Sequence, residues 1–155
     1  MTDKPLLNAT RRQILTAGGG AVLISSMPFR ASAAEADLIR ARTDLFGTRA
    51  IQEGRVTVEL PPIAENGHSV PLTVTVDSPM TDEDYVKQIV ILSPRNPLPL
   101  IAQYHLTPLS GKAAVSSRIR MSGTQAIQAI AEMSDGSLWS GSMETVVTLA
   151  ACVVL

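Results

Sequence analysis

The chain of 155 residues contains one cysteine, two histidines and an aromatic share of only 3%. A single thiol excludes a disulfide within the chain, and one cysteine with two separated histidines is not a pattern typical of a transition-metal site. Few aromatic residues predict a core of valine, isoleucine, leucine and threonine. Charged residues are 17% and hydrophobic residues 45% of the chain, which is typical of one folded globular domain.

The sequence also lacks a basic stretch and a long apolar run. The run from Ala17 to Met27 is about half of the roughly 20 residues that a membrane-spanning helix needs, and it contains three consecutive glycines. We therefore expect no membrane span and, because lysines and arginines do not cluster, no surface for nucleic acid.

The first 33 residues carry three features of an export leader in the expected order. Arg11 and Arg12 form a paired-arginine motif, a short apolar run follows, and Ala31-Ser32-Ala33 has the spacing of a signal-peptidase site. Residues 1–33 are therefore predicted to be a twin-arginine export signal, with a periplasmic mature chain. Four of the 13 basic and one of the 14 acidic residues would leave with it, so the mature domain is mildly acidic.

Residues 34–149 are predicted to be all-β, an immunoglobulin-like β-sandwich of about seven strands behind a short N-terminal helix. Helical spacing of apolar residues indicates the helix over 34–46, with Gly47 just after its end. Alternating apolar residues indicate the strands, and glycine, proline and asparagine mark the turns between them. The expected strands are 55–60, 70–76, 87–92, 100–106, 113–121, 125–133 and 144–150. The segment 125–133 could also form a short helix.

The only cysteine, Cys152, lies about three residues beyond the last predicted strand pairing. At about 3.3 Å per residue, its thiol would stand roughly 10 Å from the sandwich, displayed on a tether. In an oxidising compartment such a thiol either joins another molecule or reacts. The alternative is that Cys152 is a small buried hydrophobe in a terminal strand.

Short motifs are spread along the chain: Glu53-Gly54-Arg55-Val56, 60–71 (LPPIAENGHSVP), Asp77-Ser78-Pro79-Met80, Asp84-Tyr85-Val86, Asn96-Pro97, Gly111, 115–120 (VSSRIR) and Met133-Ser134-Asp135-Gly136. In order and spacing they resemble the SoxY family, the sulfur-carrier subunit of the bacterial Sox thiosulfate-oxidising system. The resemblance implies an immunoglobulin-like domain, a heterodimer with a SoxZ-like subunit, no cofactor, and covalent attachment of the sulfur substrate to Cys152.

The same resemblance implies three enzymes as partners: a c-type cytochrome, a dimanganese hydrolase and a sulfane dehydrogenase. The chain itself is then a carrier and not an enzyme. Tethering suits this role, because each enzyme must reach the same sulfur atom, and a tether raises the local concentration of the cargo at a docked partner.

The predicted carrier arm, residues 150–155, departs from the family's pattern. The family's arm ends Gly-Gly-Cys-Gly-Gly, whereas Cys152 is flanked here by other residues: Ala150, Ala151, Val153, Val154 and Leu155. Valine is stiff at χ1 and favours extended backbone, so this arm should be thicker and more apolar. Three alternatives follow: partners with wider sites, a divergent paralogue that handles another sulfur compound, or a non-functional tail in a binding or structural subunit.

A rival hypothesis is an enzyme that uses Cys152 as its nucleophile. Only His68 and His105 could act as its base, and a lone histidine in such positions is more often exposed or satisfied. No lysine or arginine follows Arg120, so the sequence predicts an ordinary thiol that a partner enzyme must activate. A plain adhesion module is a third class, but it gives no reason for an unpaired thiol near the end.

Other residues give weaker signals. The consecutive acids 82–84 predict a solvated turn and not a metal site, because their side chains point in different directions. Trp139 is expected in the core or an interface. Arg118 and Arg120 share one strand face, where they could form salt bridges with a partner subunit or an ordinary solvated surface.

Overall fold

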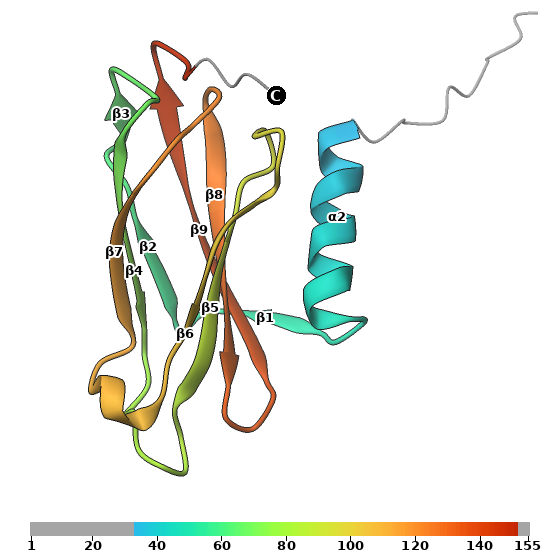
Figure 1. Ribbon diagram of the computed structural model, residues 1–155, viewed down its shortest axis with the longest axis vertical. Coiled ribbons are helices and arrows are strands. Elements are labelled where there is room, and N and C mark those ends of the chain that lie inside the picture. The colour runs from blue at the N-terminus through green and yellow to red at the C-terminus, as the bar shows by residue number, and fades with distance from the viewer. Residues whose placement is uncertain (1–32, 152–155) are drawn as a thin grey trace, which may run out of the picture. The chain divides into compact units, whose positions relative to one another are not determined.

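The computed structural model describes residues 33–151, which form two β-sheets packed face to face and one α-helix (Figure 1). No helix within this range is long and apolar enough to cross a membrane. Several residues singled out from the sequence lie outside the described residues: Arg11, Arg12, Cys152, Val153, Val154 and Leu155.

The larger sheet has six strands. Five of them follow the order β1-β9-β8-β5-β6, and the sixth, β3, also pairs with β9. Their bounds are β1 (Ile51–Glu53), β3 (Ile63–Ala64), β5 (Val86–Leu92), β6 (Leu100–His105), β8 (Gln125–Met133) and β9 (Leu138–Val147). The strands β1 and β3 run parallel to β9, and the other pairs are antiparallel.

The smaller sheet has three antiparallel strands in the order β2-β4-β7. They are β2 (Val56–Glu59), β4 (Val70–Val76) and β7 (Ala114–Ile119), and a short 3₁₀ helix, η1 (Pro108–Ser110), connects β6 to β7. The segment 125–133, which the sequence left between strand and helix, is strand β8.

Alternating side chains explain why the sheets pack against each other. In β4 the apolar residues Val70, Leu72, Val74 and Val76 are buried, and the residues between them are exposed or half-buried. The inner faces of both sheets meet in one core made almost wholly of aliphatic side chains and methionine. The predicted all-β sandwich with an aliphatic core is confirmed.

The helix α2 (Ala33–Phe46) begins one residue before the predicted start and ends at the predicted residue. Gly47 follows with φ +65°, and its N–H donates to the Thr43 carbonyl at 2.8 Å, which closes the last turn. Phe46 is 3% exposed and packs with Val90 and Leu92 of the larger sheet. The helix therefore covers the larger sheet on the side away from the smaller one (Figure 1).

The last strand differs from the prediction of 144–150, because β9 spans Leu138–Val147. Its first half carries serines and Gly141, which interrupt the apolar alternation. A Cβ on Gly141 would collide with the carbonyl oxygen of Val56, so glycine lets the two sheets approach closely there. The strands β1 and β3 have three and two residues, too few for a recognisable alternation.

Candidate functional site

The chain leaves β9 at Val147 but remains hydrogen-bonded to the domain beyond it. The Thr148 N–H donates to the Ala64 carbonyl at 3.1 Å, directly after β3 pairs with the end of β9. The Thr148 hydroxyl donates to the Glu65 carbonyl at 2.9 Å. Residue 148 is thus held by the loop between β3 and β4.

Gly67 of the same loop continues these contacts. Its N–H donates to the Leu149 carbonyl at 2.8 Å, and its carbonyl accepts the Met121 N–H at 2.8 Å. The Met121 carbonyl accepts the Ala151 N–H at 3.1 Å. A hydrogen-bonded bridge therefore runs from the loop after β3, through the turn after β7, to residue 151, across one end of the sandwich.

Ala151 lies closer to the domain than the predicted arm requires. Its side chain is 4% exposed, whereas Ala150 beside it is exposed. The sequence predicted an arm that starts at Ala150 and a thiol roughly 10 Å from the sandwich. In the structure, backbone contacts with the domain continue past the regular ladder as far as Ala151. The assumption behind the estimate of roughly 10 Å, that these contacts end with the last strand, therefore does not hold, and the position of the thiol itself lies outside the described residues.

The turn that contains Met121 is fastened to the loop after β5 by a buried polar network. The Ser93 hydroxyl donates to Oε1 of Gln125 at 2.6 Å, and the Arg95 N–H donates to the same oxygen at 3.0 Å. Ser93 is 0% and Gln125 5% exposed, so water does not compete for these bonds. Gln125 therefore holds both segments in place from the first residue of β8.

Asn96 completes this network. Its Oδ1 accepts hydrogen bonds from Nε2 of Gln125 at 3.2 Å and from the Ser122 N–H at 3.1 Å. Its Nδ2 donates to the Arg120 carbonyl at 2.9 Å, one residue before Met121. Asn96 thus holds the segment that contains Met121, whose carbonyl accepts the hydrogen bond from the Ala151 N–H.

Three arginines lie on the segments at this end of the sandwich: Arg95, Arg118 and Arg120. Arg118 and Arg120 are exposed on one face of β7 and its extension, as the sequence predicted. Arg118 donates through Nε to Ser69 Oγ at 2.8 Å, and Arg95 donates through Nη1 to the Thr124 carbonyl at 2.8 Å. These bonds tie the Arg118 and Arg95 side chains to neighbouring segments of the domain.

The structure separates the two histidines. His68 is exposed and follows Gly67 directly, with its N–H bonded to Asn66 Oδ1 at 2.8 Å. His105 ends β6 opposite Gln88 in β5, at the other end of the sandwich. Of the two candidate bases for a cysteine nucleophile, only His68 lies at the tail end.

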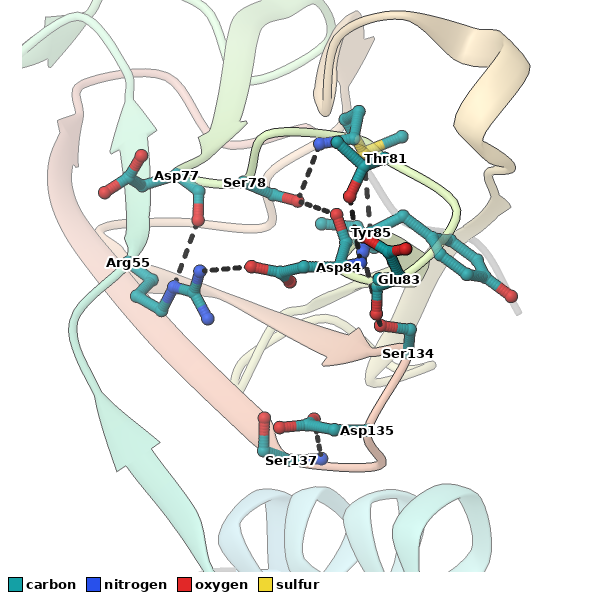
Figure 2. A network of polar contacts seen from close by, with 12 residues as sticks. Arg55, Asp77, Ser78, Thr81, Glu83, Asp84, Tyr85, Ser134, Asp135 and Ser137 are labelled. Atoms are coloured by element: carbon teal, nitrogen blue, oxygen red, sulfur yellow. Dashed lines mark hydrogen bonds and ion pairs between the residues drawn. The ribbon is translucent and has the colours of Figure 1, made fainter.

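The opposite end of the sandwich has its own polar cluster, centred on Arg55 (Figure 2). Arg55 has φ +53°, donates through Nε to the Asp77 carbonyl at 3.0 Å and pairs with the Asp84 carboxylate at 3.4 Å. Its guanidinium lies 5.7 Å from the ring centroid of Trp139. Trp139 packs against the core, as predicted, and its face is covered by this arginine.

Glu83 and Asp84, two of the three consecutive acids 82–84, belong to this second cluster. Asp84 is half-buried, and its N–H bonds to Thr81 Oγ1 at 3.1 Å. The Ser134 hydroxyl donates to the Glu83 carbonyl at 2.9 Å and so ties the loop before β5 to the turn after β8 (Figure 2). Residues 33–151 contain no group of three or more side chains that could hold a metal ion. We interpret the cluster as structural.

Comparison with known proteins gives a consistent result over most of the chain. The family model described as "Sulfur oxidation protein SoxY" matches residues 42–152, so the matched segment ends on the cysteine. Among solved structures, the sulfur carrier protein SoxY from Chlorobium limicola f thiosulfatophilum is 32% identical, with a TM-score of 0.63. The alignment covers 74% of this chain and 98% of that protein. No curated protein matches.

Superoxide reductases are also similar, at lower identity. The neelaredoxin from Ignicoccus hospitalis is 17% identical with a TM-score of 0.54, over 61% of this chain and 80% of that one. The enzyme from Nanoarchaeum equitans is 13% identical with a TM-score of 0.52, over 61% of this chain and 99% of that one. At these identities the likeness concerns the fold alone.

Proposed function

Since the chain belongs to the SoxY family of sulfur oxidation proteins, we propose that it carries thiosulfate-derived sulfur covalently on Cys152 in the periplasm. The observation that carries this proposal is the extent of the family match, which runs over residues 42–152 and includes the only cysteine. The family supplies the sulfur-carrier role in sulfur oxidation. We propose in addition that Cys152 is the attachment residue, that the compartment is the periplasm, and that the partners are those named below.

Loading in this proposal forms a disulfide bond between Cys152 Sγ and the outer sulfur of thiosulfate. The thiol proton is released, and two electrons pass to a c-type cytochrome enzyme. A dimanganese hydrolase then uses water to cleave the bond to the sulfonate group, which releases sulfate and leaves one sulfur atom on Cys152. A sulfane dehydrogenase oxidises that sulfur further. The domain's task is to present the sulfur atom to each enzyme.

The surroundings of residue 151 support a carrier more than an enzyme. Ala151 is held by backbone contacts and a buried methyl group, and these supply no acid or base. Catalysis by a cysteine would need a base in fixed geometry, and His68 is exposed on a loop. A thiol that its own chain does not activate suits a carrier, because each partner enzyme can supply the activating group in turn.

The proposal includes a SoxZ-like subunit as a heterodimeric partner. The exposed face that carries Arg118 and Arg120 offers positive charge for ion pairs with such a partner. Export through a twin-arginine leader rests on the Arg11-Arg12 motif and the small residues that follow it.

A second candidate is a SoxY-like paralogue whose tail is loaded differently or not at all, and which acts as a binding or structural subunit. The anchored Ala151 favours it, because contacts that hold the chain up to residue 151 shorten the tether that a swinging arm would need. Val153 and Val154 favour it too, since a narrow channel built for glycine would exclude them.

A complementation assay tests the proposed function. A Sox-competent bacterium that lacks its own carrier subunit receives this chain or its Cys152→Ser variant, and thiosulfate-dependent oxygen uptake is measured. The carrier proposal expects uptake with the parent chain and none with the variant. Equal uptake with both contradicts attachment to Cys152, and no uptake with a folded, partner-bound parent chain favours the second candidate.

A further inference from the structure

We propose that Gly67 is a positioning residue that clamps Ala151 to the end of the sandwich, so that the cargo-bearing residue starts from a fixed point on the domain. This inference rests on the proposed function in one respect: it assigns Cys152 as the residue that carries the cargo. The clamp itself consists only of described residues.

Glycine at position 67 is required for space and not for backbone conformation. Gly67 is buried, and it does not belong to the glycines with positive φ in the described chain. A Cβ on Gly67 would collide with the Met121 carbonyl oxygen, would lie 2.9 Å from the Ala151 nitrogen and 3.2 Å from Val147 Cγ1. These atoms belong to the two segments that meet at the clamp. Any side chain here would push the Met121–Ala151 hydrogen bond apart.

Ala151 is fixed to the domain, although the two residues before it are exposed and do not belong to β9. Leu149 is 61% exposed and Ala150 is exposed, whereas Ala151 is 4% exposed and bonds to Met121. Two contacts of different kinds, a buried methyl group and a backbone hydrogen bond, therefore act on the same residue.

The clamp decides how far the thiol can move. A tether released after Val147 would place five Cα–Cα steps before Cys152, or roughly 17 Å when extended. With Ala151 held, a single step of about 3.8 Å remains. An enzyme that acts on Cys152 must therefore receive the end of the domain, including the loop at 65–68 and the turn at 120–124. The clamp thus selects the face of the carrier that docks.

A spin label on the only cysteine reports this restriction directly. The full chain is labelled at Cys152 with a nitroxide, and its electron paramagnetic resonance spectrum is compared with that of the Gly67→Ala variant. The parent should give a slow-motion component from the clamped tail. In Gly67→Ala the ratio of slow to fast component should fall by about two- to tenfold, the change expected for losing one backbone hydrogen bond.

The matched control is Gly141→Ala. Its Cβ would also collide with a backbone carbonyl oxygen, that of Val56, but in the middle of β9. It should destabilise the domain and leave the spectrum of the folded protein unchanged. A purely structural role for Gly67 predicts the same spectrum for parent and Gly67→Ala, or the same change in both variants. Either result overturns the proposal.

A second pair of variants tests the clamp if Gly67→Ala does not fold. Ala151→Pro removes the N–H that bonds to Met121, and Ala150→Pro removes an N–H for which the described residues provide no partner. The label should become more mobile in Ala151→Pro than in Ala150→Pro, and equal mobility contradicts the clamp. The spectra do not depend on sulfur loading, so a failure of the carrier role and a failure of the clamp remain distinguishable.

Discussion

Gln125 should contribute strongly to the stability of the fold, because its buried amide joins the loop after β5 to the start of β8. Its Oε1 accepts two hydrogen bonds, from the Ser93 hydroxyl and the Arg95 N–H, and its Nε2 donates one to Asn96. Gln125→Ala removes all three and leaves the Ser93 hydroxyl, which is 0% exposed, without its acceptor.

The size of the effect follows from these bonds. Each net hydrogen bond is worth about 0.5–1.5 kcal/mol, and a buried group left unpaired costs about 1–3 kcal/mol. Some bonds will be replaced by water that enters the space of the missing amide. We therefore expect a loss of about 2–4 kcal/mol in the free energy of unfolding, a large part of the roughly 5–15 kcal/mol typical of a domain.

Equilibrium unfolding in urea, followed by the fluorescence of the only tryptophan, Trp139, measures this loss. Gln128→Ala is the matched control, since Gln128 lies on the same strand, is half-buried and has no side-chain hydrogen bond within the described chain. It should change stability by about 0.5 kcal/mol or less. Equal losses for the two variants would refute the reasoning that the buried network fastens the turn of Met121.

Three further predictions follow from the site and its surroundings. Cys152 should react with a neutral alkylating reagent no faster than an ordinary free thiol, as followed by mass spectrometry. A reaction tenfold faster than that of a free thiol would contradict a passive carrier. Burial raises the pKa of Glu132, but hydrogen bonds from Arg49 and Gln88 and the charges of Arg49 and Lys87 lower it on balance. Ionised Glu132 therefore stabilises the fold above its ordinary pKa, and this stability is lost as pH falls below about 4.5 and through the lowered value. Glu132→Gln should flatten this acid limb in urea titrations, and an unchanged limb would count against the shift. Arg55→Ala should destabilise the fold by about 1–2 kcal/mol, because it loses an ion pair, a backbone bond and the contact with Trp139. Alanine keeps the Cβ and so does not relieve the positive φ at this position, and a neutral result in the same titration would contradict the structural role of the cluster.

The regular part of the fold could be predicted because its signals are local. In β4 every second residue from Val70 to Val76 is apolar, and Gly47 follows a helix whose apolar residues have helical spacing. Such patterns fix the face of each element before any tertiary contact is known. The strands β1 and β3 were not predicted, because three and two residues are too few to show the alternation of apolar and polar residues.

The site was only partly predictable for a different reason. The chain position of Cys152 and its lack of a partner cysteine are visible in the sequence, and they indicate its chemistry. The clamp depends on Gly67 and Met121, 84 and 30 residues before Ala151, and the sequence treats Gly67 as an ordinary turn glycine. A close approach of three distant backbone segments leaves no local pattern. The role of Gln125 was hidden in the same way, since an amide at the start of a strand does not reveal its depth of burial.

The most direct test of the carrier role is the intact mass of the protein isolated from thiosulfate-grown cells without reducing agent. Sulfur carried on Cys152 predicts additional masses of about 112 Da for a thiosulfonate or multiples of about 32 Da for sulfane sulfur. These should disappear on reduction and in the Cys152→Ser variant. A protein that shows only its unmodified mass under these conditions, or adducts that persist in Cys152→Ser, would contradict sulfur carriage on this residue.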